Sequence, residues 1–323
     1  MHICIDVSPT AQKHAGLGRY AGEIARMLAD DPAVNLSLFY NRDGDATLPN
    51  YLSDVPYKTV NIGNKPWRMG VFASQMTHWP MDKTFGASDI FHATNHLLAH
   101  FGRARTVYTL HDLIFLRYPE HHKNYNRWYL TLTMPHYLKA ADVIITPSEC
   151  SKQDALEYYR LPEQKIKVIY EAAAPHFKPT PDPNAIQRVR HKYKVPDKFI
   201  LHVATIEPRK NLIRLLDALA QLRQRGCPAR LVLVGPNGWL VNGSLEQEIE
   251  TLGMKDAVQN LGYVPLEDLP GIYSLATVFA FPSLYEGFGL PPLEEIQCGC
   301  PVIVSDRASM REVVGPAGRQ LPP

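Results

Sequence analysis

Two glutamates near the C-terminal end of the chain are separated by a run of glycine, proline and apolar residues. Glu286 and Glu294 bracket the string Gly-Phe-Gly-Leu-Pro-Pro-Leu, which follows a buried apolar run. Glycines in such a turn leave backbone N–H groups exposed at the start of the helix that the two prolines begin. A carboxylate beside these N–H groups suits a polyol or phosphate ligand. The spacing therefore predicts a ligand site, although a glutamate at a helix N-terminus can also be purely structural.

A pair of cations follows another apolar run. Arg209 and Lys210 stand in the string Thr-Ile-Glu-Pro-Arg-Lys-Asn, directly after the strand predicted at 199–204. Cations at the start of a helix oppose its dipole unless an anion is bound. Two positive side chains can also offset the charge that develops on a departing nucleoside diphosphate, without a metal ion. We therefore predict that Arg209 and Lys210 bind a diphosphate.

A histidine and an aspartate follow the strand predicted at 105–110. Open α/β sheets place their sites at the carboxyl ends of strands, which is where His111 and Asp112 stand. This position favours a substrate contact for His111, with Asp112 beside it. The alternative is that His111 ends a loop and Asp112 caps the next turn.

These motifs together resemble those of retaining glycosyltransferases of family 4, which have the GT-B fold. The resemblance covers nearly the whole chain, and its most specific part is the Glu-x7-Glu spacing followed by Gly299-Cys-Pro-Val-Ile303. The string Glu-Pro-Arg-Lys-Asn-Leu is similar to that of bacterial mannosyl- and deoxymannosyltransferases of this family. Many relatives carry an additional arginine where this chain has Thr205, which leaves the division of labour between Arg209 and Lys210 open.

The resemblance also implies roles for individual residues. It implies that Glu286 lies by the donor sugar hydroxyls, that Glu294 binds the nucleotide ribose and that His111 faces the donor sugar. Catalysis is thereby assigned to His111, Arg209, Lys210 and Glu286. The other residues that we expect at the donor are Gly16, Gly18, Asp112, Gly235, Tyr263, Val264, Gly287, Phe288, Gly289 and Leu290.

The implied activity is transfer of a hexose with retention of anomeric configuration. The expected donor is a GDP-linked mannose or deoxymannose, and the expected acceptor is a glycan or a lipid-linked glycan. No side chain stands out as a nucleophile, so front-face departure and double displacement both remain open. We expect no cofactor and no metal ion. Two other functions remain open, a sugar-nucleotide epimerase of the same fold and a non-catalytic protein that binds nucleotides or glycans.

The elements that must position these residues alternate between strand and helix along the chain. This alternation predicts an α/β protein of two doubly wound, Rossmann-like domains. The expected strands are 2–7, 36–40, 57–62, 90–93, 105–110, 142–146, 165–169, 199–204, 231–234, 259–263, 278–281 and 301–305. The clearest expected helices are 19–28, 67–81, 149–159, 212–219 and 266–275.

A proline-rich stretch marks the expected domain boundary. We predict an acceptor-side domain at 1–171, a linker at 172–197 and a nucleotide-sugar domain at 198–323. Members of the family that the chain resembles usually continue beyond the position of Pro323, so we expect the last domain to be truncated at its end.

The segment Gly16-Leu-Gly18 also matches the glycine pattern of dinucleotide-binding proteins. The glycines of that fingerprint follow a strand immediately, whereas eight residues separate Gly16 from Val7. The second strand also ends in Asn41-Arg42 instead of an acidic residue that would hold a ribose. We therefore predict a flexible loop that brings its backbone to a bound phosphate or acceptor.

Composition excludes several classes of partner and site. With 34 basic and 32 acidic residues, the chain has no overall charge that would favour nucleic acid. The five cysteines are odd in number and fit a reducing compartment better than a disulfide framework. No apolar run is long enough to span a bilayer, so we expect a cytoplasmic protein. Aromatic and basic residues at 118–141 favour a half-buried helical hairpin over a membrane-facing surface, but peripheral membrane contact remains open.

Overall fold

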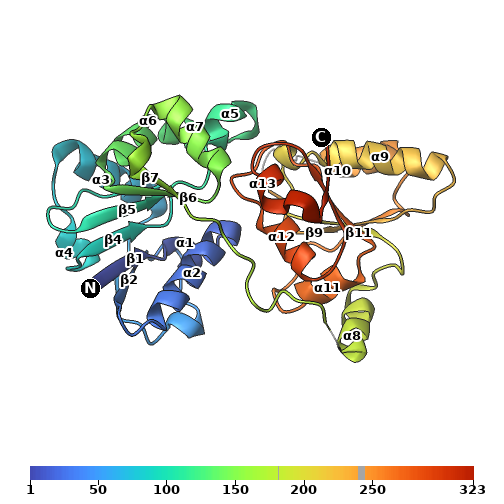
Figure 1. Ribbon diagram of the computed structural model, residues 1–323, viewed down its shortest axis with the longest axis horizontal. Helices are drawn as coiled ribbons and strands as arrows, with labels where there is room; N and C mark the ends of the chain where they lie inside the picture. The colour runs from blue at the N-terminus through green and yellow to red at the C-terminus, as the bar shows by residue number, and fades with distance from the viewer. Residues whose placement is uncertain (181, 239–243) are drawn as a thin grey trace. The chain divides into compact units, whose positions relative to one another are not determined.

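The chain folds into two compact units that interleave in sequence. The computed structural model describes residues 1–180, 182–238 and 244–323 (Figure 1). Unit 1 comprises Met1–Leu116 and Asn124–Tyr170, whereas unit 2 comprises Arg117–Lys123 and Glu171–Pro323. Unit 1 ends at Tyr170, one residue before the predicted end of the first domain at residue 171. The expected linker, 172–197, belongs to unit 2, and its residue 181 lies outside the described residues.

Unit 1 is built on a parallel sheet of seven strands in the order β3-β2-β1-β4-β5-β6-β7. The inner strand β1 pairs with β2 on one side and β4 on the other, so that Ile3 lies opposite both Leu36 and Ile90. The strands are β1 His2–Asp6, β2 Asn35–Asn41, β3 Tyr57–Val60, β4 Ile90–Ala93, β5 Arg105–Thr109, β6 Val143–Thr146 and β7 Ile166–Val168.

Helices cover both faces of this sheet because successive strand residues point to opposite sides. Phe39 packs against Trp67 in the core cluster on one face, whereas its neighbour Leu38 belongs with Ala25 to the core cluster on the other. The helices are α1 Ser8–Ala11, α2 Ala15–Ala29, η1 Asn50–Leu52, α3 Asn64–Thr77, α4 Asp82–Phe85, α5 Ile114–Arg117, α6 Asn124–Ala140, α7 Glu149–Tyr159 and η3 Glu163–Lys165.

Unit 2 contains a second parallel sheet, with six strands in the order β10-β9-β8-β11-β12-β13. The central strand β8 lies between β9 and β11, so that Leu201 lies opposite both Val232 and Phe279. The strands are β8 Ile200–Val203, β9 Leu231–Val234, β10 Val258–Asn260, β11 Val278–Phe281, β12 Val302–Ser305 and β13 Arg319–Leu321.

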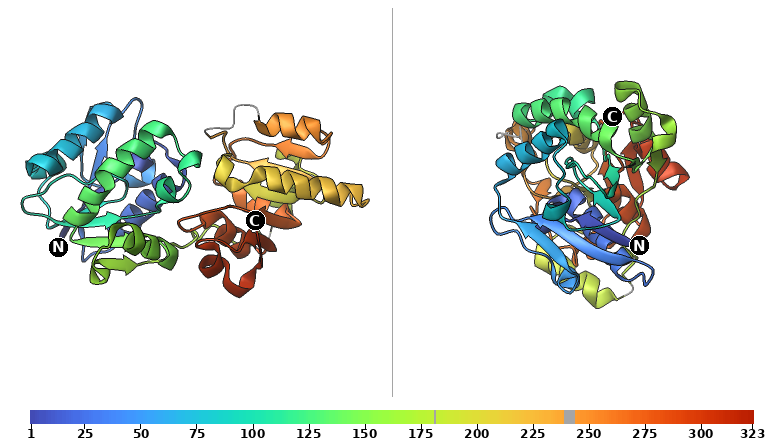
Figure 2. Two further views of the ribbon diagram at one scale, coloured as in Figure 1. Left: turned by 90° about the horizontal axis from the view of Figure 1, so that it is seen from above. Right: turned by 90° about the vertical axis from the view of Figure 1, so that its left-hand side faces the viewer.

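The helices of unit 2 again form two layers. Val232 and Ile272 belong to the core cluster on one face of the sheet, and Leu233 and Leu216 belong to the cluster on the other. Figure 2 shows helices on both faces of each sheet, which confirms the predicted pair of doubly wound domains. The helices are η2 Pro119–His121, α8 Pro183–Tyr193, η4 Pro208–Lys210, α9 Leu212–Gln224, α10 Ser244–Thr251, α11 Leu269–Leu275, α12 Leu290–Gln297, α13 Met310–Val314 and η5 Gly315–Ala317.

A short segment from the first half of the sequence belongs to unit 2. Within Arg117–Lys123, the Tyr118 ring centroid lies 6.1 Å from that of Tyr285, and the Tyr118 hydroxyl lies 3.5 Å from the Leu284 carbonyl oxygen. The chain therefore passes between the units at 116–117, at 123–124 and at 170–171.

The glycine segment near the N-terminus is helical, so the predicted flexible loop is wrong. Helix α2 begins at Ala15, and the Gly18 N–H donates to the His14 carbonyl at 3.0 Å. A Cβ at Gly18 would lie 2.8 Å from the Pro9 carbonyl oxygen, whereas one at Gly16 would meet no atom within 4 Å. Gly18 is therefore required for the close packing of α2 against α1.

The aromatic and basic segment at 118–141 does not form the helical hairpin that we expected. Residues Asn124–Ala140 form one helix, α6, which continues through Pro135, so the predicted hairpin is wrong. Tyr129 and Tyr137 lie two turns apart on its buried face, where their hydroxyls are 3.0 Å apart. This burial on both sides of the proline stabilises the helix across it. Among the described residues, no helix combines the length and apolar character needed to cross a lipid bilayer.

One fully buried carboxyl group in unit 2 makes no hydrogen bond with a described residue. Glu295 lies on α12, and neither of its carboxylate oxygens has a partner of acceptable geometry, although the Cys300 thiol is nearby. Burial raises the pKa of Glu295 from 4.5 to about 9, and the thiol opposes this rise only in part. The group is therefore protonated in the folded protein at neutral pH.

We expect Gly18→Ala to destabilise unit 1 by about 1–3 kcal/mol, because the new methyl group meets backbone. Gly16→Ala is the matched control, and we expect it to be neutral or stabilising by up to about 1 kcal/mol. Denaturant unfolding, followed by a probe in unit 1, measures both. Equal stability of the two variants would contradict the packing role of Gly18.

We expect the stability of unit 2 to depend on pH through Glu295. Between pH 4.5 and about 9 the folded state keeps a proton that the unfolded state releases, so the free energy of unfolding falls as pH rises. The slope approaches about 1.4 kcal/mol per pH unit. Glu295→Gln should remove this slope, whereas Glu246→Gln on the exposed face of α10 should not. Parallel pH profiles for the wild type and Glu295→Gln, measured by urea unfolding, would refute the assignment.

Candidate functional site

Four charged side chains of unit 2 lie together where β8 and β11 end. The Glu286 carboxylate accepts hydrogen bonds from Lys210 Nζ and from an Arg209 guanidinium nitrogen, each at 2.6 Å. Arg209 Nε also lies 2.5 Å from Glu207 Oε1. We call Glu207, Arg209, Lys210 and Glu286 the charged cluster. The structure thus brings together three of the residues to which we assigned catalysis, Arg209, Lys210 and Glu286.

The charged cluster joins two loops that are far apart in sequence. The first loop leads from β8 into η4, and the second leads from β11 into α12. The Leu284 N–H donates to the Arg209 carbonyl at 2.9 Å, and the Ser283 hydroxyl donates to Glu286 at 2.6 Å. Because β8 and β11 are neighbouring parallel strands, their carboxyl ends meet at one edge of the sheet. The ion pairs and the backbone bond therefore hold both loops in one arrangement.

The electrostatics of the cluster keep Glu286 ionised. Burial alone would raise the pKa of Glu286, but Arg209 and Lys210 outweigh it and lower the pKa from 4.5 to about 2. Burial and the neighbouring guanidinium lower the pKa of Lys210. Burial raises the pKa of Glu207, which Arg209 opposes. The two carboxylates therefore differ, and Glu207 is the more readily protonated.

The glycine turn after Glu286 is fixed by residues of the following segment. Ser309 Oγ lies 2.9 Å from the Glu286 carbonyl oxygen and 2.6 Å from that of Phe288. Gly289 has a φ of 113°, and a Cβ there would lie 2.2 Å from Met310 Cε. Glycine is therefore favoured at 289 by the backbone conformation, and a larger residue would also displace the end of the Met310 side chain. Gly287 and Phe288 are buried, and Leu290 is partly buried. Contact of these three residues with a donor stays a prediction.

Glu294 has a hydrogen-bond partner in a neighbouring helix. Its side chain is completely buried, and its carboxylate accepts a hydrogen bond from the Tyr273 hydroxyl at 3.0 Å. Tyr273 belongs to α11, so this bond ties α11 to α12. Binding of a ribose by Glu294 stays a prediction.

The two remaining turns expected at the donor contact each other. The Gly235 N–H donates to the Gly262 carbonyl at 2.7 Å. The two residues after Gly262 differ in exposure: the Tyr263 side chain is 74% exposed, whereas Val264 is buried. Their predicted contact with a nucleotide base stays a prediction.

His111 of unit 1 lies in a polar network at the ends of β4 and β5. Its Nε2 donates to the Thr94 carbonyl at 2.9 Å, and its ring meets the Tyr20 ring edge-on with centroids 4.7 Å apart. The Tyr20 hydroxyl lies 2.9 Å from Thr109 Oγ1, which lies 2.8 Å from His92 Nε2. These contacts fix the orientation of the imidazole of His111.

Asp112 accepts a hydrogen bond from the Ile114 N–H at 3.1 Å, directly before α5. This contact is the capping role that we gave as the alternative. A substrate contact for Asp112 and for His111 stays a prediction.

Sequence reasoning did not single out several residues that shape these sites. Glu207 was visible as an acidic residue beside two cations, so its ion pair with Arg209 had a signal in the sequence. Ser309 and Tyr20 had none, because their contacts lie 21 and 89 residues away in the chain. Among the described residues, no group of three His, Cys, Asp or Glu side chains is arranged to hold a metal ion. The metal-free account stays a prediction.

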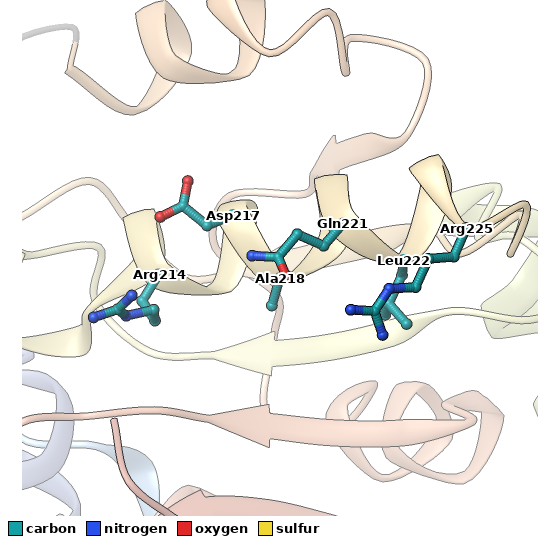
Figure 3. Close-up of a pocket in the computed structure, with 6 residues that line it drawn as sticks. All are labelled: Arg214, Asp217, Ala218, Gln221, Leu222 and Arg225. Atoms are coloured by element: carbon teal, nitrogen blue, oxygen red, sulfur yellow. The ribbon is translucent and has the colours of Figure 1, made fainter.

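A shallow depression on unit 2 does not include any member of the charged cluster. Five residues of helix α9 and Arg225, which directly follows it, line this depression, and Figure 3 shows their side chains along one side of the helix: Arg214, Asp217, Ala218, Gln221, Leu222 and Arg225. One helix face does not enclose a ligand, so we assign no substrate to this depression.

Known glycosyltransferase families and proteins match this chain along nearly its whole length. A model of glycosyltransferase family 4 matches residues 14–175, and a model of glycosyl transferases group 1 matches residues 184–321. The O-antigen chain mannosyltransferase B of Escherichia coli is 31% identical over 330 residues, which cover 98% of this chain and 86% of that protein. The O-antigen chain mannosyltransferase RfbU of Salmonella typhimurium is 28% identical over 324 residues, which cover 97% and 84%.

Solved structures show the same fold at lower identity. HepE of Anabaena in complex with UDP-glucose superposes with a TM-score of 0.75 at 22% identity and covers 100% of this chain and 86% of its own. Sucrose-phosphate synthase from Thermosynechococcus elongatus gives a TM-score of 0.76 at 19% identity, with coverage of 100% and 86%.

Proposed function

The chain belongs to glycosyltransferase family 4, and from this premise we propose that it transfers mannose or a deoxymannose from a GDP-linked donor to an O-antigen-type glycan. The charged cluster is the observation that carries the proposal. The O-antigen mannosyltransferases to which the chain is similar support the sugar and the acceptor. The acceptor is then a glycan chain, either free or linked to a lipid carrier.

The proposed chemistry begins with the diphosphate bound at Arg209 and Lys210. As the glycosidic C–O bond breaks, its electron pair moves to the phosphate oxygen, and the two cations offset this charge. The acceptor hydroxyl attacks the anomeric carbon from the same face and passes its proton to the departing phosphate oxygen, so the configuration is retained. Glu286 accepts hydrogen bonds from Arg209, Lys210 and Ser283, which makes it a weak nucleophile and favours this front-face route over double displacement.

We also propose that the protein is cytoplasmic and binds peripherally to a membrane surface. A lipid-linked acceptor would be located at that surface. Trp79 after α3 and Trp128 on α6 are 72% and 58% exposed in unit 1, and Lys65 and Arg127 supply positive charge on the same two helices. Exposed aromatic and basic side chains suit the interface of a bilayer.

We expect the donor to be recognised by its nucleotide. Thermal-shift and transfer assays with GDP-, UDP- and ADP-linked sugars should show stabilisation and turnover with GDP-mannose or its deoxy relative, and EDTA should leave turnover unchanged. Stabilisation by a UDP-sugar alone would contradict the mannose assignment, and loss of turnover in EDTA would contradict the metal-free route. An epimerised donor in the absence of acceptor would indicate the epimerase instead.

We expect Arg209→Ala and Lys210→Ala to lower kcat by about 10²–10³-fold each, because each removes a cation that meets the developing charge. Arg214→Ala on the exposed face of α9 is the matched control and should keep wild-type turnover. Circular dichroism and unfolding curves should accompany the rates, since each cluster variant leaves Glu286 with one cation fewer. Wild-type kcat in a folded Arg209→Ala or Lys210→Ala variant would exclude that side chain from catalysis.

A further inference from the structure

The charged cluster is already neutral without a ligand. It contains two cations, Arg209 and Lys210, and two carboxylates, Glu207 and Glu286, which pair with them at 2.5–2.6 Å. Glu207, Lys210 and Glu286 are 4%, 6% and 7% exposed, so water screens these charges poorly. The cations that are to receive a diphosphate therefore have anionic partners at close range.

A nucleotide sugar changes this balance. Its diphosphate carries two negative charges over the whole range near neutral pH, so the occupied cluster would hold four negative charges against two positive ones. Like charges at short range in a buried setting are strongly unfavourable, and such groups commonly relieve the repulsion by binding a proton. One carboxylate of the cluster is therefore expected to become neutral.

The hydrogen bonds distinguish the two carboxylates. Both Glu286 oxygens are engaged, because Oε1 accepts from Lys210 and Ser283 and Oε2 accepts from Arg209. Glu207 is engaged at Oε1, whereas its buried Oε2 has no hydrogen-bond partner among the described residues. A proton on Glu207 Oε2 therefore breaks no existing hydrogen bond, whereas a proton on Glu286 would replace one.

We propose that binding of a nucleotide sugar at the charged cluster is accompanied by uptake of one proton at Glu207 Oε2. The inference rests on the proposed function, because it takes the diphosphate to bind at Arg209 and Lys210. The neutral Glu207 still accepts from Arg209 Nε through Oε1, so the guanidinium stays in position while its charge is released for the ligand. Donor affinity then falls as pH rises.

A further titratable group beside the cluster is His202 of β8. Its Nδ1 donates to the Ala280 carbonyl at 2.9 Å, and its ring stacks on Phe281 with centroids 5.4 Å apart. Protonation would place a cation in this apolar stack, and burial lowers the pKa of His202 to about 4. Burial acts in the opposite direction on Glu207, whose pKa it raises. Proton uptake is therefore assigned to Glu207 and not to His202.

Isothermal titration calorimetry tests the proposal without turnover. GDP-mannose and UDP-glucose are titrated into the full chain at one pH in two buffers of different ionisation enthalpy, and the difference in observed enthalpy gives the protons taken up. These probes carry no group that titrates near neutral pH. The measurement is repeated from about pH 5.5 to 8. We expect uptake that rises toward one proton per bound donor and an affinity that falls by up to about tenfold per pH unit.

Three variants locate the proton. Glu207→Gln should abolish the uptake and make affinity nearly independent of pH, whereas Glu295→Gln and His202→Asn should keep both. Binding without proton uptake in the wild type would overturn the inference and leave the proposed function intact. Uptake that persists in Glu207→Gln would also overturn it. Absence of binding by every nucleotide sugar would overturn the proposed function itself. The wild-type measurement decides the question if a variant does not fold.

Discussion

The buried carboxylate of Glu286 between Arg209 and Lys210 is the interaction on which the candidate site depends. A buried ion pair stabilises a protein only when its geometry and its additional hydrogen bonds are good, and removal of one partner commonly costs about 3–5 kcal/mol. Here the carboxylate has both cations at 2.6 Å and the Ser283 hydroxyl as a further donor. The cations are therefore held in place before any ligand arrives, and the reaction does not need to organise them.

The parallel sheet explains how residues 76 and 77 positions apart come to meet. Strands β8 and β11 are neighbours in the sheet although β9 and β10 lie between them in the chain. Each strand delivers its following loop to the same edge, where Leu284 and Arg209 share a backbone hydrogen bond. Unit 1 applies the same rule, because His92 of β4 and Thr109 of β5 contact each other in neighbouring strands. Both units thus gather polar groups at strand ends, which is typical of doubly wound sheets.

The sequence predicted every strand except β13, and it placed Arg209, Lys210 and Glu286 after predicted strands, because both follow from simple patterns. Buried parallel strands are continuous apolar runs, and polar residues that follow them must share an edge. The start of α2 was missed because His14 is not a usual capping residue and glycine disfavours helices, so packing against α1 decides the structure there. Strand β13, Arg319–Leu321, has no apolar run, and among the described strands it pairs with β12 alone, at the edge of the sheet. The burial of Glu294 could not be predicted, because it depends on Tyr273 in another helix.

The segment Arg117–Lys123 has a consequence for how the protein can be divided and made. It is translated before the rest of unit 2, yet it packs there beside Tyr285. A fragment that starts at Glu171 would lack this segment and would uncover the surface around Tyr285, which adjoins Glu286 in the chain. During synthesis on the ribosome, the segment Arg117–Lys123 is made before the rest of unit 2. The 47 residues Asn124–Tyr170 of unit 1 are made between the two parts of unit 2. A single cut after Tyr170 therefore does not yield two fragments that each contain one complete unit.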